Sequence, residues 1–212
     1  MRRTLSVLVV LAVIGLGASV ASAATRTTVA IRAVVAQAGW ESFDEATGAG
    51  EFGVVQFARE KTRTTAFIAV SRGELVLCTG GDTPTEADDF YGFRGTSIQG
   101  EGPARLSVGR SYSSATGSAD IRAQVVTVDE CAGGSEASGT ESISVSLDMT
   151  SIGPVVTQKG RTTLAIPKQL RSKTFVQSRA RDAAGTVVLD GRKIDVGGAV
   201  GELSLRGVVI TR

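Results

Sequence analysis

The sequence predicts an all-β protein: a single antiparallel β-barrel or β-sandwich of about 11 or 12 short strands. Short runs of alternating apolar and polar residues recur along the chain, separated by Gly, Pro or charged turn residues. Val and Thr, which favour strands, are abundant, and 26 glycines supply turns and bulges. No long stretch combines helical periodicity with capping residues. These observations favour strands throughout.

The clearest pair of strands is a long hairpin over residues 117–152. Its first arm alternates small apolar residues such as Ala119 and Ala123 with polar ones, and its second arm carries the larger Val145, Leu147 and Met149 in the same pattern. Period-two alternation places each apolar set on one face of a sheet. The small residues of the first arm predict that something bulky packs over it, either a core aromatic or a ligand.

The other expected strands precede and follow this hairpin. The run Ala66–Val70 is apolar on both faces and predicts a central, doubly buried strand. Residues 79–89 predict a loop, because Pro84 excludes a central strand there. The remaining strands are expected over residues 27–37, 51–59, 63–71, 74–78, 90–98, 104–108, 162–166, 174–182, 186–190, 193–196 and 202–211.

Residues 1–23 have the features of a secretory signal peptide. Arg2 and Arg3 form the positively charged N-terminal region, an apolar stretch covers residues 5–16, and Ala21-Ser22-Ala23 is a small-residue cleavage site. The alternative is an uncleaved membrane anchor. Cleavage leaves residues 24–212 as a single all-β domain of about 189 residues with no transmembrane segment. We therefore expect a secreted or cell-envelope protein.

Composition and charge limit the possible functions. The chain has no His, so the sequence excludes Ser-His-Asp and Cys-His catalysis and imidazole metal ligands. Without the leader the basic and acidic residues are equal in number, which argues against nucleic-acid binding. From Lys159 to Lys193, however, nine basic residues accompany only Asp182 and Asp190. This stretch is either a solvated surface or a basic face for an acidic partner or polysaccharide.

Two cysteines in an exported chain are expected to pair. A bridge between Cys78 and Cys131 closes about 53 residues, and the loop-entropy relation puts its stabilisation near 4 kcal/mol. Each cysteine precedes a Gly-Gly pair, so the bridge is expected to join two loops at one end of the sheet. The alternative is a pair of free thiols that act as nucleophile or metal ligands.

Aromatic residues are few, and several of them are candidate contact residues. Tyr91 and Phe93 lie beside Arg94, a combination that suits a platform for stacking sugars or peptides, and Trp40 is expected to be exposed in an acidic connection. The alternative is that these rings fill the core.

Two further motifs predict structure rather than chemistry. Residues 48–53 match the GxGxxG pattern, but an acidic loop precedes them and a strand follows, so we expect no phosphate site. The acidic residues 82–89 lack the spacing of a calcium loop, and we expect a solvated loop.

Several short segments of the C-terminal half have a familiar pattern, namely Gly117-Ser118-Ala119, Val128-Asp129-Glu130-Cys131, Ile152-Gly153-Pro154 and Arg181-Asp182-Ala183-Ala184-Gly185-Thr186-Val187. The chain resembles uncharacterised secreted β-rich proteins of high-GC Gram-positive bacteria over about 95 residues. The resemblance implies secretion and a β fold, and it implies no activity.

The sequence leaves three hypotheses for function. The first is an exported, non-catalytic module for binding or cell-envelope interaction, with an extracellular or envelope partner whose identity is unknown. The second is a lipocalin-like barrel that carries a small apolar ligand in a pocket lined by Val29, Ile121, Val145 and Leu203. The third is an enzyme that uses two carboxylates. We expect no catalytic residue, metal or cofactor.

Overall fold

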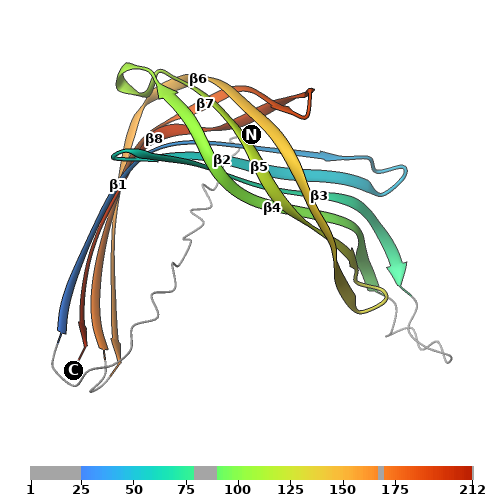
Figure 1. The fold of residues 1–212 in the computed structure, drawn as a ribbon, viewed down its shortest axis with the longest axis horizontal. Coiled ribbons are helices and arrows are strands. Elements are labelled where there is room, and N and C mark those ends of the chain that lie inside the picture. The colour runs from blue at the N-terminus through green and yellow to red at the C-terminus, as the bar shows by residue number, and fades with distance from the viewer. Residues whose placement is uncertain (1–24, 79–89, 167–169, 212) are drawn as a thin grey trace.

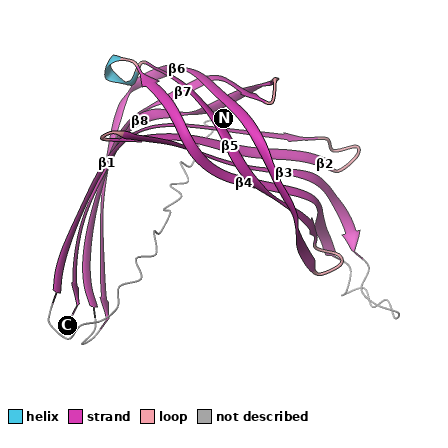
Figure 2. Ribbon diagram, in the orientation of Figure 1, coloured by secondary structure: helices cyan, strands magenta, loops and turns pink. Residues whose placement is uncertain are grey.

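The computed structural model describes residues 25–78, 90–166 and 170–211, and the expected leader and acidic loop lie outside these ranges. The described strands are β1 (Thr25–Phe43), β2 (Ala49–Glu60), β3 (Arg63–Cys78), β4 (Phe90–Val108), β5 (Ser114–Asp129), β6 (Gly134–Ile166), β7 (Leu170–Leu189) and β8 (Arg192–Thr211). Each strand pairs antiparallel with the next, and β8 pairs with β1, so the sheet closes into a barrel (Figure 1). Between β4 and β5 lies the short 3-10 turn η1 (Arg110–Tyr112) (Figure 2).

The strands extend beyond the closed barrel in two directions. At one end β6, β7, β8 and β1 continue as a four-stranded arm, because β1 pairs with β2 only from Ala33 onward but with β8 from Thr25. At the other end β3 and β4 continue together to the pair Cys78 and Phe90, which forms a second arm. Figure 1 shows the four-stranded arm at the lower left and the second arm at the lower right.

The prediction of an all-β antiparallel fold is confirmed, but the strands are longer and fewer than expected. Residues 90–108 form the single strand β4, although the sequence predicted a break near Gly100. The glycines allow close strand contact instead of turns: a Cβ at Gly100 would lie 2.8 Å from the Cα of Ala123, and one at Gly185 would lie 2.0 Å from the carbonyl oxygen of Asp148. Glycine inside a strand often marks such a close approach.

The predicted hairpin over residues 117–152 is formed by β5 and β6. Ala119 pairs with Val145 and Ile121 with Ile143, and all four side chains are buried. The bulky group over β5 is a core aromatic, Phe57 of β2. A Cβ at Gly117 would lie 2.9 Å from the Phe57 ring, so the glycine makes the space that the ring occupies.

Apolar side chains fill the closed part of the barrel. The largest fully buried ones come from strands all around the sheet: Phe57, Ile68, Ile121, Ile143, Met149, Val55, Val70, Val145, Val187 and Val200. No polar or charged residue is buried in the described ranges. The hydrophobic core therefore occupies the interior of the barrel, and charged residues are restricted to its ends and outer surface.

The expectation that Trp40 is an exposed contact residue is wrong. Strand β1 runs to Phe43, so Trp40 occupies an inward position of the alternation and is only 9% exposed. Its ring lies over its cross-strand partner Gly53, where an added Cβ would be 2.1 Å from the ring. Its Nε1 donates a hydrogen bond to Oε1 of Glu51 at 2.6 Å. Trp40 thus belongs to the core and not to a binding surface.

Glu51 forms hydrogen bonds with residues of three other strands. Besides the bond from Trp40, its carboxylate accepts hydrogen bonds from Nε of Arg72 at 3.0 Å and from Nη2 of Arg192 at 2.5 Å. Partial burial acts to raise the pKa of Glu51, but the bonds from Arg192 and Trp40 and the charges of the two arginines outweigh it, and the pKa is lowered. The ionised carboxylate therefore joins strands β1, β2, β3 and β8.

Replacement of Glu51 by glutamine is expected to destabilise the protein at neutral pH by about 1–3 kcal/mol, because charge-assisted hydrogen bonds are lost. A carboxyl whose pKa is lowered on folding stabilises above its unfolded pKa, and the stabilisation is lost as the pH falls through the folded pKa. The difference between the wild type and E51Q should therefore shrink as the pH drops below about 4. Urea unfolding followed by Trp40 fluorescence over a pH series measures it.

The matched control is E41Q, since Glu41 is exposed on the same strand that carries Trp40. This variant should unfold at about the wild-type urea concentration at every pH. A constant stability difference between the wild type and E51Q from neutral to acidic pH would contradict the assigned role of the Glu51 carboxylate.

Candidate functional site

The second arm presents a row of apolar side chains to solvent. Leu75 and Leu77 of β3 pair with Phe93 and Tyr91 of β4, and residues two apart in a strand share a face. Tyr91 is 73% exposed and Leu77 54%, and Leu75 is also exposed. This face is the outward continuation of the barrel wall, because the inward face of the same strands carries Ile68 and Ile98.

Two aromatic residues of β1 and β2 extend this row. Phe43 and Phe52 are both more than half exposed, and the register places them on the outer face beside the second arm. We name as the apolar patch the following six residues: Phe43, Phe52, Leu75, Leu77, Tyr91 and Phe93.

Glycines beneath the patch hold two of its rings flat against the sheet. Gly50 and Gly73 are cross-strand partners. A Cβ at Gly50 would lie 3.1 Å from the ring of Phe43, and one at Gly73 would lie 2.7 Å from the ring of Phe93. Both rings therefore lie across backbone that has no side chain.

The GxGxxG run over residues 48–53 lies in a turn and in strand β2. Gly48 has a φ of +70°, in the turn between β1 and β2. Gly50 lies beneath Phe43, and Gly53 lies beneath Trp40. The three glycines thus serve one turn and two ring contacts in a strand, with no helix N-terminus after them to hold a phosphate.

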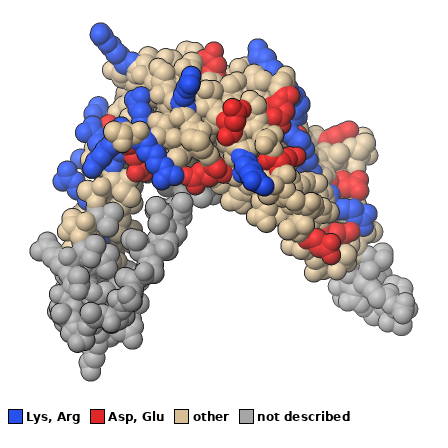
Figure 3. Space-filling view, viewed as in Figure 1, with Lys and Arg blue, Asp and Glu red and all other residues tan. Residues whose placement is uncertain are grey.

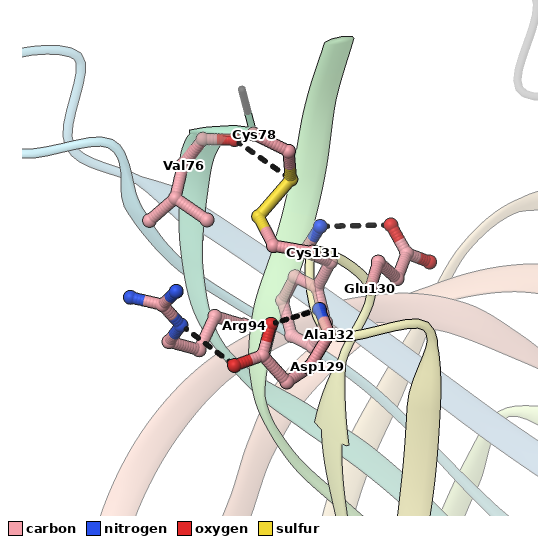
Figure 4. Close-up of a disulfide and its surroundings, with 8 residues drawn as sticks. Val76, Cys78, Arg94, Asp129, Glu130, Cys131 and Ala132 are labelled. Atoms are coloured by element: carbon pink, nitrogen blue, oxygen red, sulfur yellow. Dashed lines mark hydrogen bonds and ion pairs between the residues drawn. A yellow bond between two sulfur atoms is a disulfide. The ribbon is translucent and has the colours of Figure 1, made fainter. Parts of the chain in front are cut away.

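A disulfide between Cys78 and Cys131 fixes the patch-bearing arm, as predicted (Figure 4). It joins the end of β3 to the turn between β5 and β6. Glu130 reinforces the junction, because its carboxylate accepts the backbone N–H of Phe93 at 2.8 Å and its own N–H donates to the Phe93 carbonyl at 3.0 Å. The arm is therefore held at its tip by one covalent bond and two hydrogen bonds.

The structure separates Arg94 from the rings that it was expected to assist. Neighbouring residues of a strand point to opposite faces, so Arg94 lies on the face away from Phe93. Its Nε donates to Oδ2 of Asp129 at 3.1 Å (Figure 4). The backbone N–H of Ala132 is the main cause of the lowered pKa of Asp129, and the charge of Arg94 adds to it. Arg94 thus positions the β5–β6 turn instead of lining the patch.

Of the four predicted contact residues, the structure brings together only Tyr91 and Phe93. Sequence reasoning missed Phe43, Phe52, Leu75 and Leu77. The alternation over residues 74–78 was recognised as a strand, but alternation alone does not distinguish a face that packs from one that remains in solvent. Leu75 and Leu77 project outward because they alternate with the inward positions of β3, which Ile68 and Val70 occupy in the closed part of the barrel.

Over residues 25–78, 90–166 and 170–211, no three acidic or cysteine side chains gather in a group that could hold a metal ion. In the same ranges no helix has the length and apolar character needed to span a membrane. Comparison with protein-family models, with curated proteins and with solved structures finds no match to this chain.

Proposed function

We propose that the protein is an exported, non-catalytic binding module that contacts its partner through the apolar patch. The observation that supports this function is the shared, outward face of Phe43, Phe52, Leu75, Leu77 and Tyr91, each about half exposed or more. Exposed apolar area costs roughly 25 cal/mol per Å² relative to burial. Contiguous exposed patches of this kind mark interaction surfaces in soluble proteins.

Export is supported by three features. The disulfide is typical of proteins that fold in an oxidising compartment. Residues 1–23 have the charge, apolar stretch and small-residue cleavage site of a signal peptide. The resemblance to secreted β-rich proteins of high-GC Gram-positive bacteria points the same way. We place the mature protein outside the cell or at the cell envelope.

The composition of the patch favours a protein partner over a sugar. Sugars stack on flat rings, whereas the centre of this patch is formed by the branched side chains of Leu75 and Leu77 beside Tyr91. Aliphatic residues next to a tyrosine, whose hydroxyl stays hydrated, suit a partner surface that is itself apolar with a polar rim. The partner we propose is a protein of the cell envelope or of the extracellular medium.

The other two hypotheses receive less support. Ile121 and Val145, which were expected to line a ligand pocket, belong to the packed core, and Leu203 lies on the outer face of β8. The side chain of Val29 lies outside the described set. A carboxylate enzyme needs a general acid with a raised pKa, yet the pKa values of Asp44, Glu51, Asp129 and Glu202 are all lowered.

The double variant L77S/Y91S is expected to lose partner binding without unfolding. Both side chains are exposed, so their replacement should change stability by less than about 1 kcal/mol. The mature protein, immobilised, is incubated with envelope and extracellular proteins of the source cells. The wild type should retain a defined protein, and the variant should retain at least about tenfold less of it, which corresponds to about 1.4 kcal/mol.

A matched control carries two substitutions on the opposite, polar outer surface, S118A/S146A, and should retain the partner as the wild type does. Photo-crosslinking from position 91 in secreting cells, compared with position 118, gives an independent readout. Equal retention by the wild type and L77S/Y91S, together with no crosslink specific to position 91, would refute the proposed contact surface.

A further inference from the structure

The four-stranded arm sorts its charged residues onto one face. The register pairs Arg179 with Glu202, Arg32 with Ser204 and Arg206 with Phe175. Alternation then places six basic side chains on the face that is continuous with the barrel interior. They are Arg32, Lys159, Arg161, Lys173, Arg179 and Arg206. Glu202 is the only acidic residue among the described positions of this face. We call this surface the basic face.

Within the arm, the described positions of the opposite face carry no charged residue. Its described positions alternate with those of the basic face and include Ile31, Leu203, Leu205 and Val176. A sheet that met only solvent could carry charged residues on both faces. Their restriction to one face therefore indicates a binding surface. Figure 3 shows blue side chains gathered at the left, where this arm leaves the barrel, and red ones mainly elsewhere.

The β2–β3 turn adds a second wall and turns the face into a groove. Arg59 and Lys61 line a hollow of about 580 Å³ together with Arg32, Glu202, Ser204 and Arg206. Figure 1 shows the tip of the β2–β3 hairpin beside β1 at the base of the arm. The hollow thus holds four basic side chains, one carboxylate and one hydroxyl.

The single carboxylate positions one arginine of the hollow, and a second, Arg59, donates from Nη1 to the Leu106 carbonyl at 3.1 Å. Nε and Nη2 of Arg32 donate to Oε1 and Oε2 of Glu202, each at 2.8 Å, and the Tyr112 hydroxyl donates to Oε2 at 3.3 Å. The bond from Arg32 is the main reason that the pKa of Glu202 is lowered. In the described part of the chain, Lys61, Arg179 and Arg206 form no salt bridge with an acidic side chain.

The positive charges repeat with the spacing of the sheet. Neighbouring strands lie about 4.8 Å apart and alternate residues about 7 Å apart along a strand, so the basic groups cover an area of roughly 15 by 15 Å. A single small anion would meet two or three of them. A linear polymer with an oxyanion on each repeat meets several at once, and arginine forks bind phosphate and carboxylate oxygens alike.

The same face lacks the platform that a nucleic acid needs. Single strands bind through several aromatic rings on which successive bases stack. The strands of the described basic face carry one ring, Phe175, and the guanidinium of Arg161 lies 5.3 Å from its centroid. We propose that the basic face binds a linear polyanion without bases, whose repeats carry phosphodiester or carboxylate groups, and that this site is separate from the apolar patch.

The test uses the mature full-length protein with four probes: long-chain inorganic polyphosphate, polygalacturonate, inorganic phosphate and single-stranded DNA. Isothermal titration should show binding of at least one polymer. Its affinity should fall about tenfold or more between about 50 and about 200 mM salt, because the basic side chains displace counterions from the polymer. Inorganic phosphate should bind far more weakly. Preference for polyphosphate assigns polymers with a phosphate oxyanion on each repeat as the source, and preference for polygalacturonate assigns uronate polymers.

The double variant K61Q/R206Q should bind the preferred polymer about tenfold more weakly with a smaller salt dependence, since two cations are removed. The matched control R105Q/R122Q removes the same charge from the polar outer surface and should bind as the wild type does. Equal losses in both variants, no binding of either polymer at low salt, or tighter binding of single-stranded DNA than of either polymer would overturn the proposal. L77S/Y91S should bind polymer normally, so this test is independent of the proposed function.

Discussion

Replacement of Phe57 by alanine is expected to destabilise the protein by about 3–5 kcal/mol. Phe57 is fully buried, and its ring fills the space over Gly117 in the middle of the barrel. The opposing residues of β5 are small and part of a closed sheet, so they cannot move inward to fill the cavity. Urea unfolding followed by Trp40 fluorescence should show a lower midpoint with little change in slope.

The matched control deletes the same ring from the neighbouring outer position. Phe52 lies on the same strand and is more than half exposed, so F52A should change stability by less than about 1 kcal/mol. A second test uses the coupling between the ring and the glycine beneath it. G117A should destabilise the wild type, because its Cβ would lie 2.9 Å from the ring, and should cost less in the F57A background. Equal costs in the two backgrounds would refute the contact.

Loss of the disulfide is the second large effect that we expect. The bridge closes a loop with a sequence separation of 53 residues, and the loop-entropy relation gives about 4 kcal/mol as the upper figure for its contribution. The double variant C78A/C131A should therefore unfold at a markedly lower urea concentration. Alanine is the better replacement because Cys78 is buried, and a serine hydroxyl would add a polar group there.

Reduction provides the control for this substitution. Dithiothreitol should lower the stability of the wild type to that of C78A/C131A and should leave the variant unchanged. Amide exchange should increase first in residues 75–78 and 90–93, since these lie beyond the closed barrel and depend on the bridge. Alkylation of two thiols in the native, unreduced protein would disprove the bridge.

The predictions that succeeded depend on local patterns. The β5–β6 hairpin was recognisable because Ala119, Ile121 and Val145 repeat with a period of two, which only a strand satisfies. The pairing of Cys78 with Cys131 followed from a count of two cysteines behind a leader, without any knowledge of distance. The number of strands was overestimated because a glycine such as Gly100 gives the same signal in a turn and at a close strand contact.

The contact residues were predicted less well, for a different physical reason. Trp40 and Tyr91 are both aromatic residues in strands, and nothing local distinguishes them. Trp40 is buried because its position on β1 faces the barrel interior over Gly53, whereas Tyr91 is exposed because it lies on the outer face beside Leu77. The burial of a side chain depends on how all the strands close into a barrel, so it cannot be inferred from one segment of the sequence.

The sequence by itself determined the all-β class, the antiparallel hairpins and the disulfide, since these follow from residue periodicity and cysteine number. Only the tertiary structure decided which apolar residues form a core and which form a patch. Closure of β8 on β1 determines which side of each strand faces the interior and where that interior ends. The strands continue past it, and Leu75 and Leu77 lie on their outer face at one end. At the other end the same continuation aligns Arg32, Arg179 and Arg206, which are far apart in the chain, on one charged face.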